Sequence, residues 1–69
     1  MKITSTAQAR KVLEVDMIVY TKSGDYVKVI GLTDTKVDCI DAIINEDGNV
    51  HTVGGAYYRT YTDFIGEEI

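Results

Sequence analysis

Tyrosines are the side chains of this 69-residue sequence best suited to recognition chemistry: there are five of them, with one phenylalanine and no tryptophan. A tyrosine ring buries a large area while its hydroxyl stays in water, and the ring face attracts cations. We therefore expect a protein-binding surface, with carboxylates beside the rings to suit a basic partner. The candidate protein-binding residues are Tyr20, Tyr26, Tyr57, Tyr58, Tyr61, Asp25 and Asp63. Two alternatives stay open: some rings fill the core, or several converge on a pocket for a small ligand.

Nucleophilic catalysis would require Cys39 and His51, the single cysteine and the single histidine. A reactive cysteine needs positive surroundings that favour the thiolate. Cys39 instead lies between Asp38 and Asp41, whose carboxylates disfavour it. We therefore predict no catalytic residues and a protein that is not an enzyme.

Acidic side chains also raise the question of metal binding. The segment Asn45–Asn49 lacks the alternating oxygen ligands and the distant glutamate of a calcium loop, and its Asp-Gly pair is explained by a turn. We expect a solvated acidic face, no metal site and no cofactor. The acidic residues in these turns and strands are Asp34, Asp38, Asp41, Glu46 and Asp47.

The charge balance makes nucleic-acid binding the less favoured alternative. Eleven acidic and seven basic residues give a net charge of -4, whereas proteins that hold nucleic acid generally present a basic stripe. The lysines and arginines form no continuous run. In this alternative Tyr20 and Tyr26 would stack on bases. The phosphate contacts would come from Arg10, Lys11, Lys22 and Lys28.

No apolar run approaches the ~20 residues that a membrane helix needs. The N-terminal residues Met1–Ser5 lack the apolar core of a secretory signal. A lone cysteine cannot form an internal disulfide, which agrees with a reducing compartment. We expect a cytoplasmic protein with no membrane contact.

The sequence predicts a short helix over about residues 5–13, because helix formers follow the capping residues Thr4, Ser5 and Thr6. Branched and aromatic residues then predict strands over 17–21, 26–32, 36–44 and 50–53, with Ser-Gly-Asp and Asp-Gly turns between them. Gly54 and Gly55 interrupt the pattern.

Residues 56–65 fit two interpretations. The spacing of Tyr57, Tyr61, Phe64 and Ile65 suits a helix, whereas the tyrosine and threonine content favours a strand. We prefer a strand that closes the sheet. The fold class is then mainly β: a single domain over 1–69, with an antiparallel barrel of 4–5 strands over about 16–65.

The segment from Leu13 to Leu32 resembles the opening hairpin of SH3-like barrels of the KOW and Tudor type. It contains an acidic residue before an alternating strand, a glycine-containing loop and a second strand. Where such domains commonly place Gly-Asp, this chain has Val15-Asp16. The resemblance implies a fold and not an activity, because these barrels include peptide-binding, RNA-binding, methyl-lysine-binding and structural modules. Small stand-alone copies are similar to accessory proteins of bacteria and phages.

These observations together predict a non-enzymatic protein-interaction module. It would act as a bacterial or phage accessory or inhibitor-like regulatory protein through its tyrosine-rich, acidic surface, with a basic protein as the partner. Apolar residues on both faces of Lys36–Ile44 exceed what one small barrel must bury. They predict a homodimer.

Overall fold

The computed structural model describes residues 1–69 and contains one α-helix, four strands and one 3-10 helix. It confirms the mainly β class and the short N-terminal helix. The elements are α1 (Thr6–Val12), β1 (Ile18–Tyr20), β2 (Tyr26–Leu32), β3 (Lys36–Ile44), β4 (Val50–Thr60) and the 3-10 helix η1 (Tyr61–Phe64).

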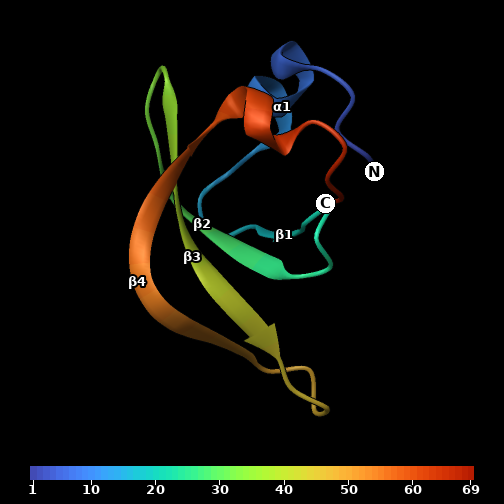
Figure 1. Ribbon diagram of the computed structural model, residues 1–69, viewed down its shortest axis with the longest axis vertical. Coiled ribbons are helices and arrows are strands. Elements are labelled where there is room, and N and C mark those ends of the chain that lie inside the picture. Colours follow the sequence, from blue (N-terminus) through green and yellow to red (C-terminus); the bar gives the residue numbers. More distant parts are fainter.

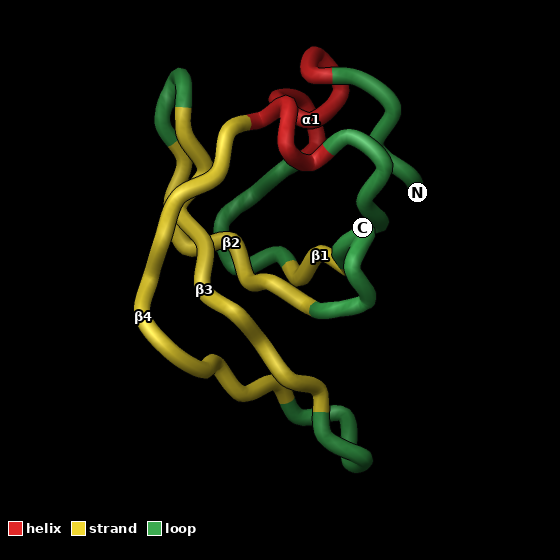
Figure 2. Tube along the Cα trace, viewed as in Figure 1, coloured by secondary structure: helices red, strands yellow, loops and turns green.

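The four strands form one antiparallel sheet in the order β1-β2-β3-β4, so each strand pairs with its neighbours along the chain. Figures 1 and 2 show that the sheet curves around α1 and that the β3–β4 hairpin projects beyond the rest of the molecule. No pairing joins β1 to β4. The sheet is therefore open, and the closed barrel that the sequence predicts is not confirmed.

The core lies on the inner, concave face of the sheet. The register places Val19 beside Val27 and Val29 beside Cys39 on this face. Val37, two residues before Cys39 on β3, lies on the same face. The two helices lie together at the upper end of the curve (Figure 1), and Ala9, Tyr61 and Phe64 join the same core from there. The buried cluster consists of Ile3, Ala9, Leu13, Val19, Val27, Val29, Val37, Cys39, Tyr61 and Phe64.

The helix α1 begins as the sequence predicts. The Ser5 hydroxyl accepts a hydrogen bond from the Gln8 N–H at 3.1 Å, which satisfies one of the free donors of the first turn. Ala9 is buried and packs the helix against the core.

Gly54 and Gly55 bend β4 but do not end it, so the predicted break at this position is wrong. Between the pairs Cys39–Tyr57 and Asp41–Val53 the register shifts, which leaves three β4 residues opposite Ile40. Gly54 adopts φ 75°, a conformation that glycine reaches without steric cost. The bulge curves the strand and lets residues 56–60 continue along β3.

The predicted closing strand over 56–65 is correct only as far as Thr60. Tyr61–Phe64 form a 3-10 turn that folds back over the core, where Tyr61 and Phe64 are buried. Because the chain turns inward at this point, β4 does not reach β1.

The C-terminal residues cover the free edge of β1. Tyr20 and Glu68 exchange backbone hydrogen bonds of 2.8 and 2.9 Å, and Ile3 donates to the Glu67 carbonyl at 2.9 Å. The edge of β1 is therefore paired, whereas the outer edge of β4 has no backbone partner.

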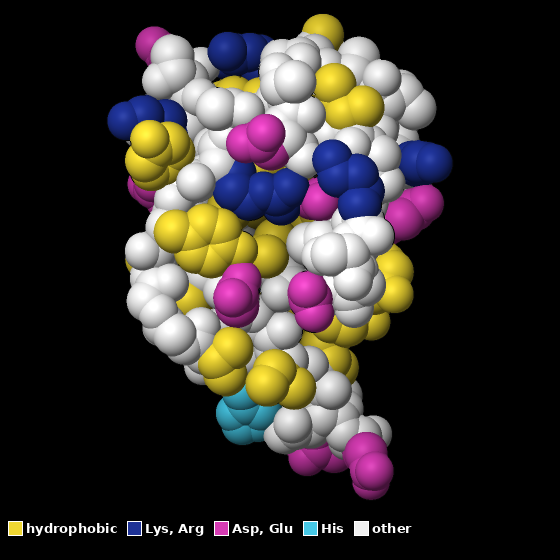
Figure 3. Space-filling model, viewed as in Figure 1, with side chains coloured by type: hydrophobic (Ala, Val, Ile, Leu, Met, Phe, Trp, Pro, Cys, Tyr) yellow, Lys and Arg dark blue, Asp and Glu magenta, His cyan; other side chains and the backbone are white.

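Beyond the core, the projecting hairpin leaves apolar side chains in solvent. Ile43 and Val53 lie on the inner face and are 51% and 41% exposed. Figure 3 shows hydrophobic side chains beside the single histidine at this end.

The structure contains no helix with the length and hydrophobicity needed to cross a bilayer.

Candidate functional site

The outer edge of β4 is an unpaired edge of the sheet. The strand pairs with β3 on one side only, and Figure 1 shows it at the boundary of the sheet. Every residue from Val50 to Tyr58 is exposed. Natural edge strands are commonly protected by lysine, proline or a bulge. β4 has the bulge at Gly54 and Gly55 but neither lysine nor proline, so its second half, Ala56–Thr60, is open to pairing except at the Thr60 N–H, which donates to a side chain.

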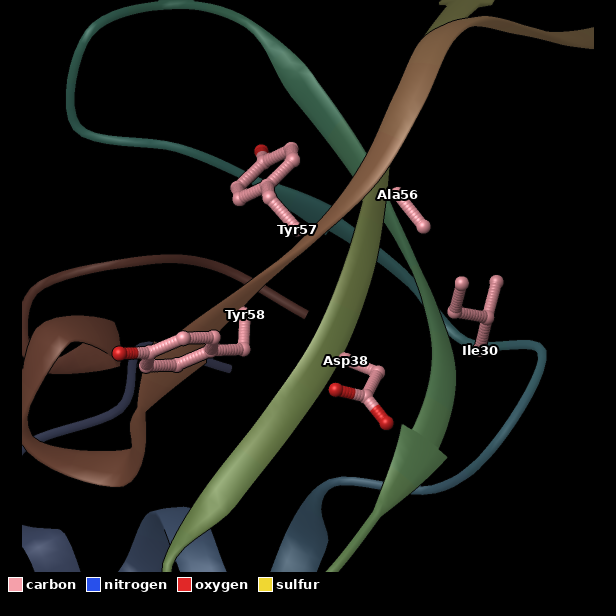
Figure 4. A pocket seen from close by; sticks show the side chains of 5 residues that line it. All are labelled: Ile30, Asp38, Ala56, Tyr57 and Tyr58. Atoms are coloured by element: carbon pink, nitrogen blue, oxygen red, sulfur yellow. The ribbon is translucent and has the colours of Figure 1, made fainter.

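A hollow of about 370 Å³ lies beside this half of β4. Its lining is Ile30, Asp38, Ala56, Tyr57 and Tyr58, contributed by β2, β3 and β4 (Figure 4). Asp38 pairs with Tyr58 across the β3–β4 ladder and with Gly31 across the β2–β3 ladder. The hollow is therefore mostly apolar and contains one carboxylate.

Asp38 depends on Gly31 for its position. A methyl group added at Gly31 would lie 3.0 Å from Oδ2 of Asp38, so the absence of a side chain there makes room for the carboxylate. None of the three ion pairs in the structure includes Asp38. Its negative charge is thus free to meet a charge from outside the chain.

The adjacent residues Tyr57 and Tyr58 leave β4 in different directions (Figure 4), as alternation along a strand requires. The Tyr57 hydroxyl donates to Oδ1 of Asp41 at 2.6 Å on the inner face. Burial and this hydrogen bond raise the pKa of Tyr57 above its ordinary value. Tyr58 is 59% exposed on the outer face, and the Lys36 ammonium lies 4.5 Å from its ring centroid.

Tyr61, by contrast, is a packing residue. Its ring is buried, its hydroxyl donates to the Thr33 carbonyl at 2.6 Å, and the Arg10 guanidinium lies 4.5 Å from its ring centroid. This arrangement matches the alternative in which part of the tyrosines fill the core.

Tyr20 and Tyr26 form a separate pair at the other end of the sheet, with ring centroids 5.0 Å apart. They belong to β1 and β2, so β3 separates them from β4. Asp25 precedes Tyr26 in the turn and accepts a hydrogen bond from the Ser23 hydroxyl at 3.2 Å. The structure therefore divides the candidate tyrosines into two surfaces and one core residue.

Asp63 stabilises the start of η1. Its carboxylate accepts the Thr60 N–H at 3.0 Å, and the hydrogen bonds from Thr60 lower the pKa of Asp63. The carboxylate thus already has a partner within the chain.

The basic residues of the nucleic-acid alternative do not form one surface. Arg10 donates to the Asp34 carbonyl, Lys22 donates to the Asp63 carbonyl at 3.1 Å, and Lys28 pairs with Asp16 at 3.7 Å. Three of the four cations therefore contact the protein itself, which disfavours a shared phosphate site.

On the inner face, β4 is linked to the C-terminal segment by an ion pair that sequence reasoning missed. Arg59 donates to both carboxylate oxygens of Glu67, at 2.7 and 2.9 Å, and Glu67 is almost completely buried. Burial by itself lowers the pKa of Arg59, but the hydrogen bonds and charge of Glu67 outweigh it and raise that pKa. Side chains thus bridge the gap that no backbone pairing closes.

A second hollow of about 220 Å³ is lined in part by this pair and by Asp25 and Asp41. No group of three or more histidine, cysteine or acidic side chains is arranged to hold a metal ion.

Cys39 and His51 lie apart. Cys39 pairs with Tyr57 and His51 with Ile43, on opposite sides of the bulge. Cys39 is fully buried, and burial is the main reason that its pKa is raised to about 11. The thiol therefore packs in the core in its protonated form.

Comparison with models of protein families, with curated proteins and with solved structures finds no match for this chain.

Proposed function

We propose that the protein is an interaction module that binds an extended segment of a partner protein along the outer edge of β4. In this mode the segment adds a strand to the sheet, and main-chain hydrogen bonds supply affinity. The observation that carries the proposal is the contrast between the two edges: Glu68 covers β1, while nothing pairs with β4.

The side chains around β4 support a protein partner. Tyr57 and Tyr58 are 40% and 59% exposed, so both offer apolar ring area, although the Tyr57 hydroxyl already donates to Asp41. Such rings are enriched at the energetic centres of interfaces. The net charge of -4 favours a basic segment over an acidic one.

The test is selection of a displayed library of random dodecapeptides on the immobilised full chain, followed by amide chemical-shift mapping of the enriched peptides. We expect the largest shifts in Ala56–Thr60, because an added strand would donate to and accept from this backbone. Shifts confined to the Tyr20–Tyr26 surface, or no enriched peptide at all, would refute the proposal.

Backbone pairing can be separated from other peptide binding by N-methylation of alternate peptide residues. In one peptide, methyl groups replace the amide hydrogens that face β4. In a second peptide, they replace the amide hydrogens that face solvent. We expect the first set of methyl groups to weaken binding by about tenfold or more, since two or more backbone hydrogen bonds are lost, and the second to leave it unchanged. Equal binding of both peptides would contradict strand addition.

Pairing of β4 with the same strand of a second copy is a distinct outcome of these experiments. It would give a concentration-dependent dimer in sedimentation velocity without any added peptide. A dimer that the dodecapeptides do not dissociate would replace the proposed partner with a second copy of the chain.

A further inference from the structure

The hollow beside β4 has the composition of a site for one long basic side chain. Its lining combines four apolar or aromatic residues, Ile30, Ala56, Tyr57 and Tyr58, with a single carboxylate, Asp38, that forms no ion pair. Lysine and arginine place an apolar stem below a charged head. The wall would contact such a stem, and the Asp38 carboxylate would meet the head.

The position of the hollow relative to the edge suits a side chain that arrives from an added strand. Neighbouring strands lie about 4.8 Å apart, so a strand on β4 would stand two strand spacings from Asp38. A long side chain must cross β4 to reach it. Ala56 is the small residue at which it can cross, and Figure 4 shows its side chain on the same side of β4 as Ile30 and Asp38, whereas the Tyr58 ring points away from them.

Lys36 precedes Asp38 by two residues on the same face of β3. Its ammonium lies over the Tyr58 ring, 4.5 Å from the centroid, and forms no ion pair with a carboxylate. The Asp38 charge is consequently not neutralised by its own strand neighbour.

We propose that this hollow is a specificity pocket for a lysine or arginine side chain of the segment that pairs with β4. The proposal rests on the proposed function and defines its substrate class: an extended peptide with a basic residue at the position that faces Ala56. The backbone of β4 supplies affinity for any extended chain, and Asp38 selects among chains.

The experiment is a double-mutant cycle on an enriched peptide that shifts the β4 amides. Its basic residue is replaced by norleucine, which keeps the stem and removes the charge, and Asp38→Asn is made in the protein. We expect norleucine to weaken binding to the wild-type protein about three- to fivefold, the range for a partly exposed ion pair. The same replacement should have no effect on the Asp38→Asn protein.

Asp41→Asn is the matched control. Asp41 lies on β3 as Asp38 does, and its removal changes the net charge equally, but its carboxylate contacts Tyr57 on the opposite face. In this variant the norleucine effect should equal that of the wild type. Ala56→Leu should fill the crossing point and weaken the lysine peptide more than a peptide with alanine at that position.

The outcomes distinguish the pocket from the edge. If peptides shift the β4 amides but show no preference for a basic residue, the pocket is refuted while strand addition stands. A norleucine effect that persists in Asp38→Asn would also refute the pocket. If no peptide shifts the β4 amides, strand addition and the pocket are both refuted.

Discussion

Replacement of Glu67 by glutamine should lower the free energy of unfolding much more than replacement of an exposed glutamate would. The Glu67 and Arg59 side chains are 2% and 17% exposed, and the carboxylate also accepts the Lys22 N–H at 3.3 Å. Glutamine keeps the size of the side chain but leaves the Arg59 guanidinium without a counter-charge. Breaking a buried pair in this way costs ~3–5 kcal/mol. We expect about 3 kcal/mol, because Arg59 retains some contact with water.

That loss is large for a chain of this length. A domain of 69 residues has a total unfolding free energy of roughly 3–10 kcal/mol. A loss of about 3 kcal/mol corresponds to a decrease in Tm of roughly 12–24 °C. Urea unfolding followed by circular dichroism measures the free energy directly, and the m value shows whether the unfolded state has changed.

Glu68→Gln is the neighbouring control. The Glu68 side chain forms an ion pair only with the N-terminal ammonium, at 3.2 Å, and is 51% exposed, so its replacement should cost less than about 1 kcal/mol. A double variant in which Arg59 and Glu67 are both methionine should recover most of the stability lost by either single change. If Glu67→Gln lowers the free energy of unfolding no more than Glu68→Gln does, the Arg59–Glu67 pair does not stabilise the contact between β4 and the C-terminal segment.

Three further predictions concern single side chains. The lowered pKa of Asp63 stabilises the fold at pH values above about 3.9, the pKa of an aspartate in the unfolded chain, and this stabilisation is lost as the pH falls through the folded pKa. Asp63→Asn should therefore reduce the loss of unfolding free energy below about pH 4. An unchanged dependence of the unfolding free energy on acid pH would contradict this. Burial raises the pKa of Cys39 to about 11, so at pH 8 it should react with iodoacetamide roughly a hundredfold more slowly in the folded than in the unfolded protein. Equal reaction rates would show an accessible thiolate. Phe64→Ala should cost about 3–5 kcal/mol and leave little folded protein by circular dichroism, because the ring is fully buried; a cooperative unfolding transition near that of the wild type would disprove it.

Strands with strong local patterns were predictable from the sequence. The bounds of β2 and β3 agree with the predicted 26–32 and 36–44. The alternation of side chains along a strand and the turns at its ends both depend on residues that are close in sequence. The glycine pair misled the prediction at β4. Glycines can end a strand or form a bulge within it, and only pairing with β3 decides between the two.

The site was less predictable than the fold. The sequence pointed to Tyr57 and Tyr58 but could not separate their faces, since the bulge before them shifts the register with β3. In the sequence, Asp38 is notable only as a neighbour of Cys39 and as one of several acidic residues weighed for metal binding. Its position in a hollow depends on the pairing of β3 with β2 and β4, which brings Gly31 and Ala56 beside it. Glu67 gave no local signal, because its partner lies eight residues earlier and the contact forms only when η1 turns the chain.

The pairing of the two ends of the chain has a consequence for how the protein folds. Ile3 exchanges backbone hydrogen bonds with Gly66 and Glu67, and Glu68 pairs with Tyr20, so these contacts close most of the chain into one long loop. Contacts between residues distant in sequence slow folding, because loop entropy is lost before the contacts form. During synthesis the β2–β3 hairpin can form early, whereas β1 has an unpaired edge until residues 66–68 emerge. Completion of the native state is thus a late event, after translation of nearly the whole of the described chain.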